Sequence, residues 1–257
     1  MRIKSLNLLT LLVVLFLSFA SCTTDEAAKK TARASNDLPL GASANDFLSD
    51  ENYTSLDVEI VYVTGFPPTS AAISQLEIFF EKYIYKPGGI FITTRAIPAP
   101  NLGTYSLEEL KQLETKHRSI FTSENTLGAY IFFADNKSES AGINQIVIGK
   151  AYRNTSMVVF EKEVRGLAAN SNISISEIQH TTMRHEFGHL FGLVDNGTEA
   201  QTDHEDPNPD YKAHCNVKGC LMAASIEFGG SPFDSVEGNN GFLDFKEKCQ
   251  LDLKANG

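Results

Sequence analysis

Hydrophobic residues alternate with polar ones in several short stretches of the chain and recur every three or four residues in longer ones. Alternation is typical of a strand with one buried face, and Leu56, Val58 and Ile60 alternate with Asp57 and Glu59. In other stretches, hydrophobic residues recur three or four positions apart, which is the spacing of a helix with one buried face. The expected strands cover 55–65, 88–97, 127–135 and 144–161, the last with a turn near Asn154. The expected helices cover 70–85, 106–121, 174–194 and 242–255.

Two of these helices carry a start signal. Ser106 with Glu109, and Ser174 with Glu177, form the Ser-x-x-Glu pattern of a capping box. Helices alternate with strands early in the chain, and this order favours a partly parallel sheet with helices packed against it. We therefore expect an α+β domain over 54–257, built on a mixed, twisted sheet.

The N-terminus has the pattern of a targeting signal. Residues 1–21 combine early basic residues with an apolar run that is too short for a comfortable membrane span. The run ends in "SFASC", which resembles a bacterial lipobox, although Phe19 stands where Leu is usual. This resemblance implies that Cys22 is lipidated and anchors the protein to a membrane of the cell envelope, in the periplasm or on the cell surface. An ordinary cleaved signal peptide is the alternative.

Composition divides the rest of the chain. Residues 22–53 are rich in Ala, Ser, Asp and Lys and poor in aromatic residues, which is typical of a flexible tether. The chain as a whole is 42% hydrophobic and 21% charged, as expected of a globular protein. Its net charge of −10, without a basic stripe, argues against nucleic acid as a partner.

The stretch "MRHEFGHLFGLVDNG", residues 183–197, carries the candidate chemistry. His185 and His189 are four residues apart and project from one face of a helix, which suits two nitrogens on a zinc ion at roughly 2.0–2.1 Å. Glu186 lies beside them, where it can act on a water molecule rather than on the metal. Gly192 would end the helix and let the chain turn back toward the metal. A helix with two surface histidines is the alternative, and this longer pattern argues against it.

The pattern His-Glu-x-x-His-x-x-Gly resembles the metzincin zinc peptidases. The resemblance covers about 174–222 and implies a zincin domain with a long active-site helix and a methionine turn beneath Zn²⁺. Met222, in "CLMAAS", is the candidate for that methionine. The resemblance also implies hydrolysis of peptide bonds by zinc-activated water, with Glu186 as the general base.

The third zinc ligand is open between three residues. Asp195 stands at the family position after the glycine, as in snapalysin-like members. The string "HCNVKGCLM" is similar to one that archaemetzincins carry directly after that glycine, which implies that His214 is the ligand and that 194–212 is an inserted loop. His204 lies inside this loop and is the third candidate. We favour His214.

Three cysteines follow Cys22. Thiols tend to pair outside the cytoplasm, and we expect a disulfide between Cys215 and Cys220 with Cys249 left over. Archaemetzincins carry a further Cys-x-x-Cys pair where this chain has Cys249 alone, so a second, all-cysteine zinc site is not expected. Two other histidines, His117 and His180, are expected to be surface or packing residues.

Two functions remain. The first is a secreted, lipid-anchored zinc metalloendopeptidase, a monomer that acts on peptides or proteins. The second is a non-catalytic metal-binding surface lipoprotein, a binding or adhesion module. An intact Glu186 favours the enzyme, because a metal site kept only for structure is usually closed by a fourth ligand. The substrate cannot be read, since residues 223–241, which would line the pocket beyond the scissile bond, show no recognisable pattern.

Overall fold

The computed structural model describes residues 33–141, 146–227, 229 and 243–257 of the chain. The predicted signal peptide and Cys22 lie outside these residues, as does most of the segment that follows Met222. Within the described ranges, no helix is both long enough and apolar enough to cross a membrane.

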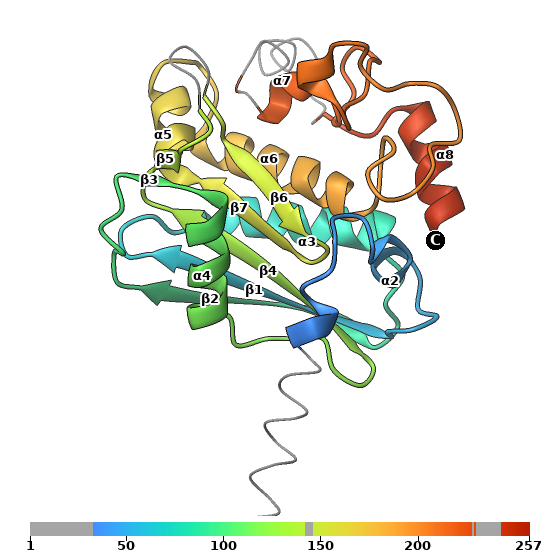
Figure 1. The fold of residues 1–257 in the computed structure, drawn as a ribbon, viewed down its shortest axis with the longest axis horizontal. Coiled ribbons are helices and arrows are strands. Elements are labelled where there is room, and N and C mark those ends of the chain that lie inside the picture. Colours follow the sequence, from blue (N-terminus) through green and yellow to red (C-terminus); the bar gives the residue numbers. More distant parts are fainter. Residues whose placement is uncertain (1–32, 142–145, 228, 230–242) are drawn as a thin grey trace, which may run out of the picture.

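A five-stranded sheet forms the centre of the molecule (Figure 1). Its strand order is β2-β1-β4-β7-β6; the first four strands are parallel, and β6 pairs antiparallel with β7 at the edge. The bounds are β1 Ser55–Val63, β2 Gly89–Ile97, β4 Thr126–Ala134, β6 Gly149–Arg153 and β7 Ser156–Phe160. Two short strands, β3 (Thr104–Tyr105) and β5 (Lys137–Ser138), pair separately. The expected mixed sheet is confirmed, including the turn at Asn154.

Helices cover both faces of this sheet: α3 and α6 lie behind it and α4 in front (Figure 1). Both predicted capping boxes are present, at the starts of α4 and α6. Helix α5 was not expected, because it begins directly at the end of β7 without a side-chain cap. The bounds are α2 Ala44–Leu48, α3 Ser70–Tyr83, α4 Leu107–His117, α5 Glu161–Ala169, α6 Ile175–Leu190, α7 Ala224–Glu227 and α8 Glu247–Asn256.

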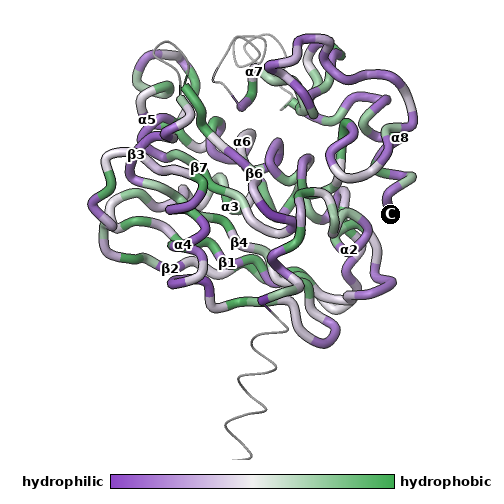
Figure 2. The backbone as a smooth tube through the Cα atoms, viewed as in Figure 1, coloured by the Kyte–Doolittle hydropathy of each residue, from purple (hydrophilic) through white to green (hydrophobic). Residues whose placement is uncertain are grey.

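The hydrophobic core has two parts, one on each face of the sheet. Hydrophobic stretches follow the central strands (Figure 2). On one face, Leu56 and Ile60 of β1 pack with the cluster that includes Phe80 of α3 and Phe187 of α6. On the other face, the strands pack with Leu110 of α4. The sheet therefore holds α6 firmly against one side.

Strand β1 is buried on both faces, although its alternation predicts only one buried face. Glu59 is 2% exposed because the end of α4 and the turn after it cover this side. Its carboxylate accepts hydrogen bonds from Arg95 at 2.8 Å and from the backbone N–H of Ser119 at 2.7 Å. A buried carboxylate that is hydrogen-bonded in this way can occupy a position where the pattern predicts solvent.

Residues 33–53, which the sequence analysis assigns to a flexible tether, pack against the domain instead. Phe47 is fully buried, and its ring lies 5.9 Å from that of Phe187 and 5.7 Å from that of Phe191. Asn36 is also buried. The folded part therefore begins upstream of residue 54, because single buried anchors hold a segment whose overall composition is polar.

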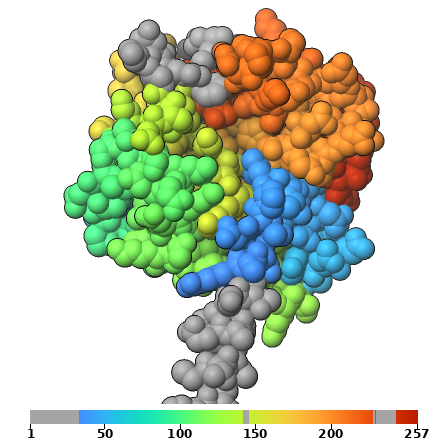
Figure 3. Space-filling view, in the orientation of Figure 1, coloured from blue at the N-terminus to red at the C-terminus, as the bar shows by residue number. Residues whose placement is uncertain are grey.

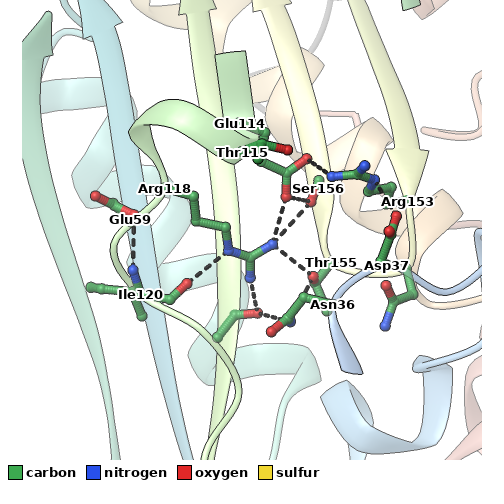
Figure 4. A network of polar contacts seen from close by, with 12 residues as sticks. Asn36, Asp37, Glu59, Glu114, Thr115, Arg118, Ile120, Arg153, Thr155 and Ser156 are labelled. Carbon is green, nitrogen blue, oxygen red and sulfur yellow. Dashed lines mark hydrogen bonds and ion pairs between the residues drawn. The ribbon is translucent and has the colours of Figure 1, made fainter. Parts of the chain in front are cut away.

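A buried polar network attaches this N-terminal segment to the sheet (Figure 4). The Arg118 guanidinium donates to Glu114 at 2.8 Å, and Arg153 donates to the other oxygen of the same carboxylate at 2.9 Å. Thr155 links this ion-pair network to the N-terminal segment, since its hydroxyl accepts a hydrogen bond from Arg118 at 3.2 Å and from the Asn36 side-chain amide at 2.9 Å. In Figure 3 the N-terminal segment (blue) lies between the strands (green and yellow) and the C-terminal loops (orange).

Candidate metal centre

Helix α6 carries His185, Glu186 and His189, and all three side chains are buried. The helix ends at Leu190, and Gly192 follows with a φ of 75°, a left-handed conformation that favours glycine. The predicted helix end is confirmed at this glycine. The chain can therefore leave the helix axis just after the second histidine.

The structure brings His214 to the two helix histidines. The ring centroids of His185 and His189 are 4.9 Å apart, and His214 lies 5.2 Å from the first and 5.0 Å from the second. One donor atom from each ring, together with a carboxylate oxygen of Glu227, lies within 4.8 Å of all the others. Four donor atoms therefore surround one point.

Backbone carbonyls orient two of these rings. Nδ1 of His185 lies 2.7 Å from the carbonyl oxygen of Leu221, and Nδ1 of His214 lies 2.9 Å from that of Lys212. A carbonyl can only accept, so each ring donates from Nδ1, and Nε2 of the neutral His185 ring carries a lone pair. Nε2 of His185 is buried without a hydrogen-bond partner. Nitrogen lone pairs directed at a common point are what a metal ion requires.

Burial also favours the metal-binding form of the two helix histidines. It lowers the pKa of His185 to about 4 and lowers the pKa of His189 as well, and the neighbouring histidines add to this effect. Both rings are therefore neutral near pH 7. Neutral imidazole is the form that coordinates a metal.

Glu186 points one oxygen into the same space. Its Oε2 accepts a hydrogen bond from the backbone N–H of Ala151 in β6 at 2.6 Å, while its Oε1 is buried without a hydrogen-bond partner. A Cβ on Gly149 would lie 2.6 Å from Oε1, so the glycine makes room for this carboxylate. Burial raises the pKa of Glu186, and the nearby Glu227 carboxylate raises it further.

The other two candidates for a third ligand lie elsewhere. Asp195 is exposed, and its Oδ1 accepts a hydrogen bond from the backbone N–H of Ala200 at 2.7 Å, so it closes a turn in its own loop. The neighbouring Asn196 was missed: its side-chain amide lies 3.1 Å from Nδ1 of His189. The sequence signal that could have indicated Asn196 is the turn pattern Asp-Asn-Gly at residues 195–197. His204 belongs to a separate cluster.

Met222 lies against the metal-site helix. It is fully buried, and a Cβ on Gly188 would lie 2.1 Å from its sulfur, so the glycine allows this close contact. The carbonyl of Met222 accepts a hydrogen bond from the backbone N–H of Cys215 at 2.7 Å. The loop that carries His214 is therefore tied to the methionine beneath the helix.

The three cysteines form a second cluster with His204. The predicted Cys215–Cys220 disulfide is not formed; all three thiols are free and buried. Cys220 Sγ lies 3.5 Å from Cys249 Sγ, and His204 Nε2 lies 3.7 Å from Cys249 Sγ. The donor atoms of His204, Cys215 and Cys249 all lie within 4.8 Å of one another. The thiols converge because α8 brings Cys249 to the loop that holds the other two.

A backbone carbonyl orients the histidine of this cluster. His204 donates from Nδ1 to the carbonyl of Thr202 at 2.7 Å, and its Nε2 lies 3.7 Å from Cys249 Sγ. Nε2 lies 3.3 Å from Oδ2 of Asp252, a buried oxygen without a hydrogen-bond partner. Hydrogen bonds from the Cys215 and Cys249 thiols lower the pKa of Cys220 to about 3. Thiolate and imidazole donors at this spacing can hold zinc.

Comparisons with known proteins identify the fold. No protein-family model matches the sequence, and no curated protein matches it. Archaemetzincin from Methanopyrus kandleri has a similar structure, with a TM-score of 0.51 and 18% identity over 79% of this chain and 96% of that chain. The expected metzincin-like fold is thereby confirmed.

Two further solved structures match with lower scores. A zinc-dependent peptidase from Methanocorpusculum labreanum matches with a TM-score of 0.45 and 14% identity over 76% of this chain and 99% of its own. Metalloproteinase-II from Bacteroides fragilis matches with a TM-score of 0.41 and 12% identity over 82% of this chain and 56% of its own.

Proposed function

We propose that this protein is a zinc-dependent metallopeptidase. One observation carries the proposal: the donor atoms of His185, His189 and His214 converge, and the buried Glu186 carboxylate lies beside them without being part of the donor group. Three histidine imidazoles are a ligand set of catalytic zinc. The orphaned Nε2 of His185 supports the fit of a cation at this point.

Glu186 has the position of a general base. When bound, zinc would polarise the scissile carbonyl group and lower the pKa of a water molecule. The hydrogen bond from Ala151 holds Oε2, so Oε1 remains to accept a proton from the attacking water. Glu186 would then deliver this proton to the amine nitrogen that leaves.

The edge of the sheet supports a peptide as the substrate. Strand β6 lies at the edge of the sheet and pairs only with β7 among the described strands, and an extended peptide can pair with an edge strand. A cleft of about 990 Å³ and a smaller pocket of about 210 Å³ at the histidines share Lys150 of β6 in their walls. A peptide along β6 would therefore pass the Glu186 carboxylate.

The second cluster favours an additional, structural zinc. His204, Cys215 and Cys249 provide three donor atoms within 4.8 Å of one another, and Cys220, whose Sγ lies 3.5 Å from Cys249 Sγ, would supply the fourth donor of a closed structural zinc site. The site would join α8 to the loop between α6 and Met222. This proposal replaces the disulfide that the sequence analysis predicts.

The cellular location of the protein is the subject of a separate proposal. We propose that the protein is exported and anchored by a lipid on Cys22, and the small residues before this cysteine support it. The alternative function, a non-catalytic metal-binding lipoprotein, requires the same anchor and the same metal. The two functions differ only in whether the bound metal hydrolyses peptides.

The central test is Glu186→Gln. We expect this variant to keep zinc and to lose peptide hydrolysis by at least about 10²–10⁴-fold, because it removes a base and leaves the three histidines intact. Zinc content and cleavage of a quenched fluorescent peptide library, before and after chelation, measure the two effects. Glu199→Gln, an exposed glutamate on the following loop, is the matched control.

Two outcomes would contradict the proposal. If Glu186→Gln releases zinc as readily as His185→Ala, then Glu186 is a ligand rather than a base. If the zinc-loaded parent cleaves no peptide in the library, the non-catalytic function is favoured.

A further inference from the structure

A second carboxylate, that of Glu227 in α7, lies among the three histidines. Its Oε2 is 2.9 Å from Nε2 of His214, and it belongs to the group of four donor atoms that lie within 4.8 Å of one another. Four ligands at the usual zinc distances lie roughly 3.4 Å apart in a tetrahedron. Small inward movements of these side chains would therefore give a complete four-ligand site.

The position of Glu227 is held by the fold. Its backbone carbonyl accepts a hydrogen bond from the N–H of Ile148 at 2.9 Å, just before β6. The preceding residue, Ile226, is fully buried in the core. The Glu227 side chain itself is 15% exposed. The carboxylate is thus directed at the histidines by its own backbone and is not a loose surface group.

Two carboxylates, those of Glu186 and Glu227, line the pocket at the histidines. Glu186 is tied to β6 by the Ala151 hydrogen bond, whereas the Glu227 carboxylate lies 2.9 Å from Nε2 of His214. The Glu186 carboxylate therefore lies beside the group of donor atoms, and the Glu227 carboxylate belongs to it.

We propose that Glu227 is a fourth protein ligand of the zinc ion, so that the resting site is closed. The inference rests on the proposed zinc site. Catalytic zinc needs an open position, so Glu227 has to leave the metal before a peptide can be hydrolysed. Glu227 borders both the pocket at the histidines and the larger cleft. A peptide that enters the cleft meets this carboxylate and displaces it.

Cobalt substitution tests the coordination without relying on activity. The protein, Glu227→Ala, Glu227→Gln and a control, Asp210→Asn, are loaded with Co²⁺, and azide is added while the visible spectrum is recorded. Asp210 lines the same cleft but lies outside the donor group. The spectrum of His214→Ala, which keeps only the cysteine cluster, is subtracted. Zinc affinity is measured by competition with a chelator.

We expect both Glu227 variants to respond to azide at concentrations at least about tenfold lower than those needed to change the spectrum of the parent or of Asp210→Asn. The reason is that the fourth coordination position is open only in the Glu227 variants. Zinc affinity at the histidine site should fall at least about tenfold, as loss of even an outer partner of a ligand costs about 10–100-fold. Equal azide sensitivity of the parent and both variants would overturn the proposal.

Activity separates this inference from the proposed function. If the closed site limits turnover, Glu227→Ala cleaves peptides faster than the parent, whereas a catalytic role of Glu227 would make it slower and contradict the proposal. If all proteins bind metal and none cleaves peptide, the metallopeptidase proposal fails. The azide comparison would still decide whether Glu227 is a ligand.

Discussion

At the scale of residues, a hydrogen bond from Nδ1 to a backbone carbonyl determines where the Nε2 atom of each loop histidine points. His214 and His204 lie in the same long loop, and each donates to a backbone carbonyl two residues before it. Each therefore offers Nε2 to a different cluster: His214 to the two histidines of α6, and His204 to the cysteines. Sequence spacing treats them as competitors for one site, whereas the structure separates them.

This separation predicts the zinc content of single variants. We expect two zinc ions per chain in the parent, one for each donor group, and about one per chain in both His214→Ala and His204→Ala. Asp195→Ala should retain both ions, because Asp195 is exposed and bonds within its own loop. Elemental analysis of the purified proteins measures the ratio.

The two losses should also differ in their consequences. His214→Ala should abolish peptide hydrolysis, while His204→Ala should mainly lower the free energy of unfolding, since it opens a site that joins α8 to the loop. Zinc that stays at two per chain in His204→Ala would rule out the second site. Release of zinc by Asp195→Ala, with retention by His214→Ala, would reverse the ligand assignment.

At the scale of elements, the segment 33–53 shows how a few anchors dock a polar stretch. Phe47 packs edge-on against Phe187 of α6, which stands between His185 and His189 in the sequence, and Asn36 completes a buried polar network. Leu40 lines the pocket at the histidines. This segment therefore contacts the metal-site helix through Phe47 and the pocket at the histidines through Leu40.

Substitution of the anchor tests this role. Phe47→Ala should lower the free energy of unfolding by about 3–5 kcal/mol, because it leaves a cavity in the core beneath α6. Leu38→Ala is the control, since Leu38 is 43% exposed and such a change typically costs less than about 0.5 kcal/mol. Urea denaturation curves measure both.

Truncation gives an independent measurement. Removal of residues 1–32 should leave the unfolding midpoint unchanged, whereas removal of residues 1–53 should lower it, because only the second deletion takes away Phe47 and Asn36. Equal midpoints for the two truncated proteins would show that the segment is a tether after all.

At the scale of the whole molecule, the start of the folded part limits the reach of the proposed anchor. Ten residues, 23–32, separate Cys22 from the described domain, and a chain of this length spans at most about 36 Å. A lipid on Cys22 would therefore keep the start of the described domain within about this distance of the membrane surface.

The anchor is tested by partition. The parent, expressed in a bacterial host, should enter the detergent phase on phase separation, and Cys22→Ala should stay in the aqueous phase. Ser21→Ala, which keeps a small residue before the cysteine, is the control and should behave like the parent. A Cys22→Ala protein that still enters the detergent phase would show that another feature holds it to the membrane.

Local patterns in the sequence determined much of the fold. Alternation and helical spacing located the long strands and α3, α4, α6 and α8, because both periodicities follow from backbone geometry. The capping boxes at Ser106 and Ser174 marked two helix starts, and Gly192 marked the end of α6. The pair His185 and His189 was readable for the same reason, since one turn of helix places both rings together.

Only the tertiary structure decided what reaches this pair from elsewhere. His214 and Glu227 come from a loop and a short helix, where no period relates sequence distance to distance in space. The docking of Phe47 and the burial of Glu59 likewise depend on which elements cover a given face. A local pattern can place the residues of one helix, but the closure of a metal site depends on contacts between segments that are distant in the chain.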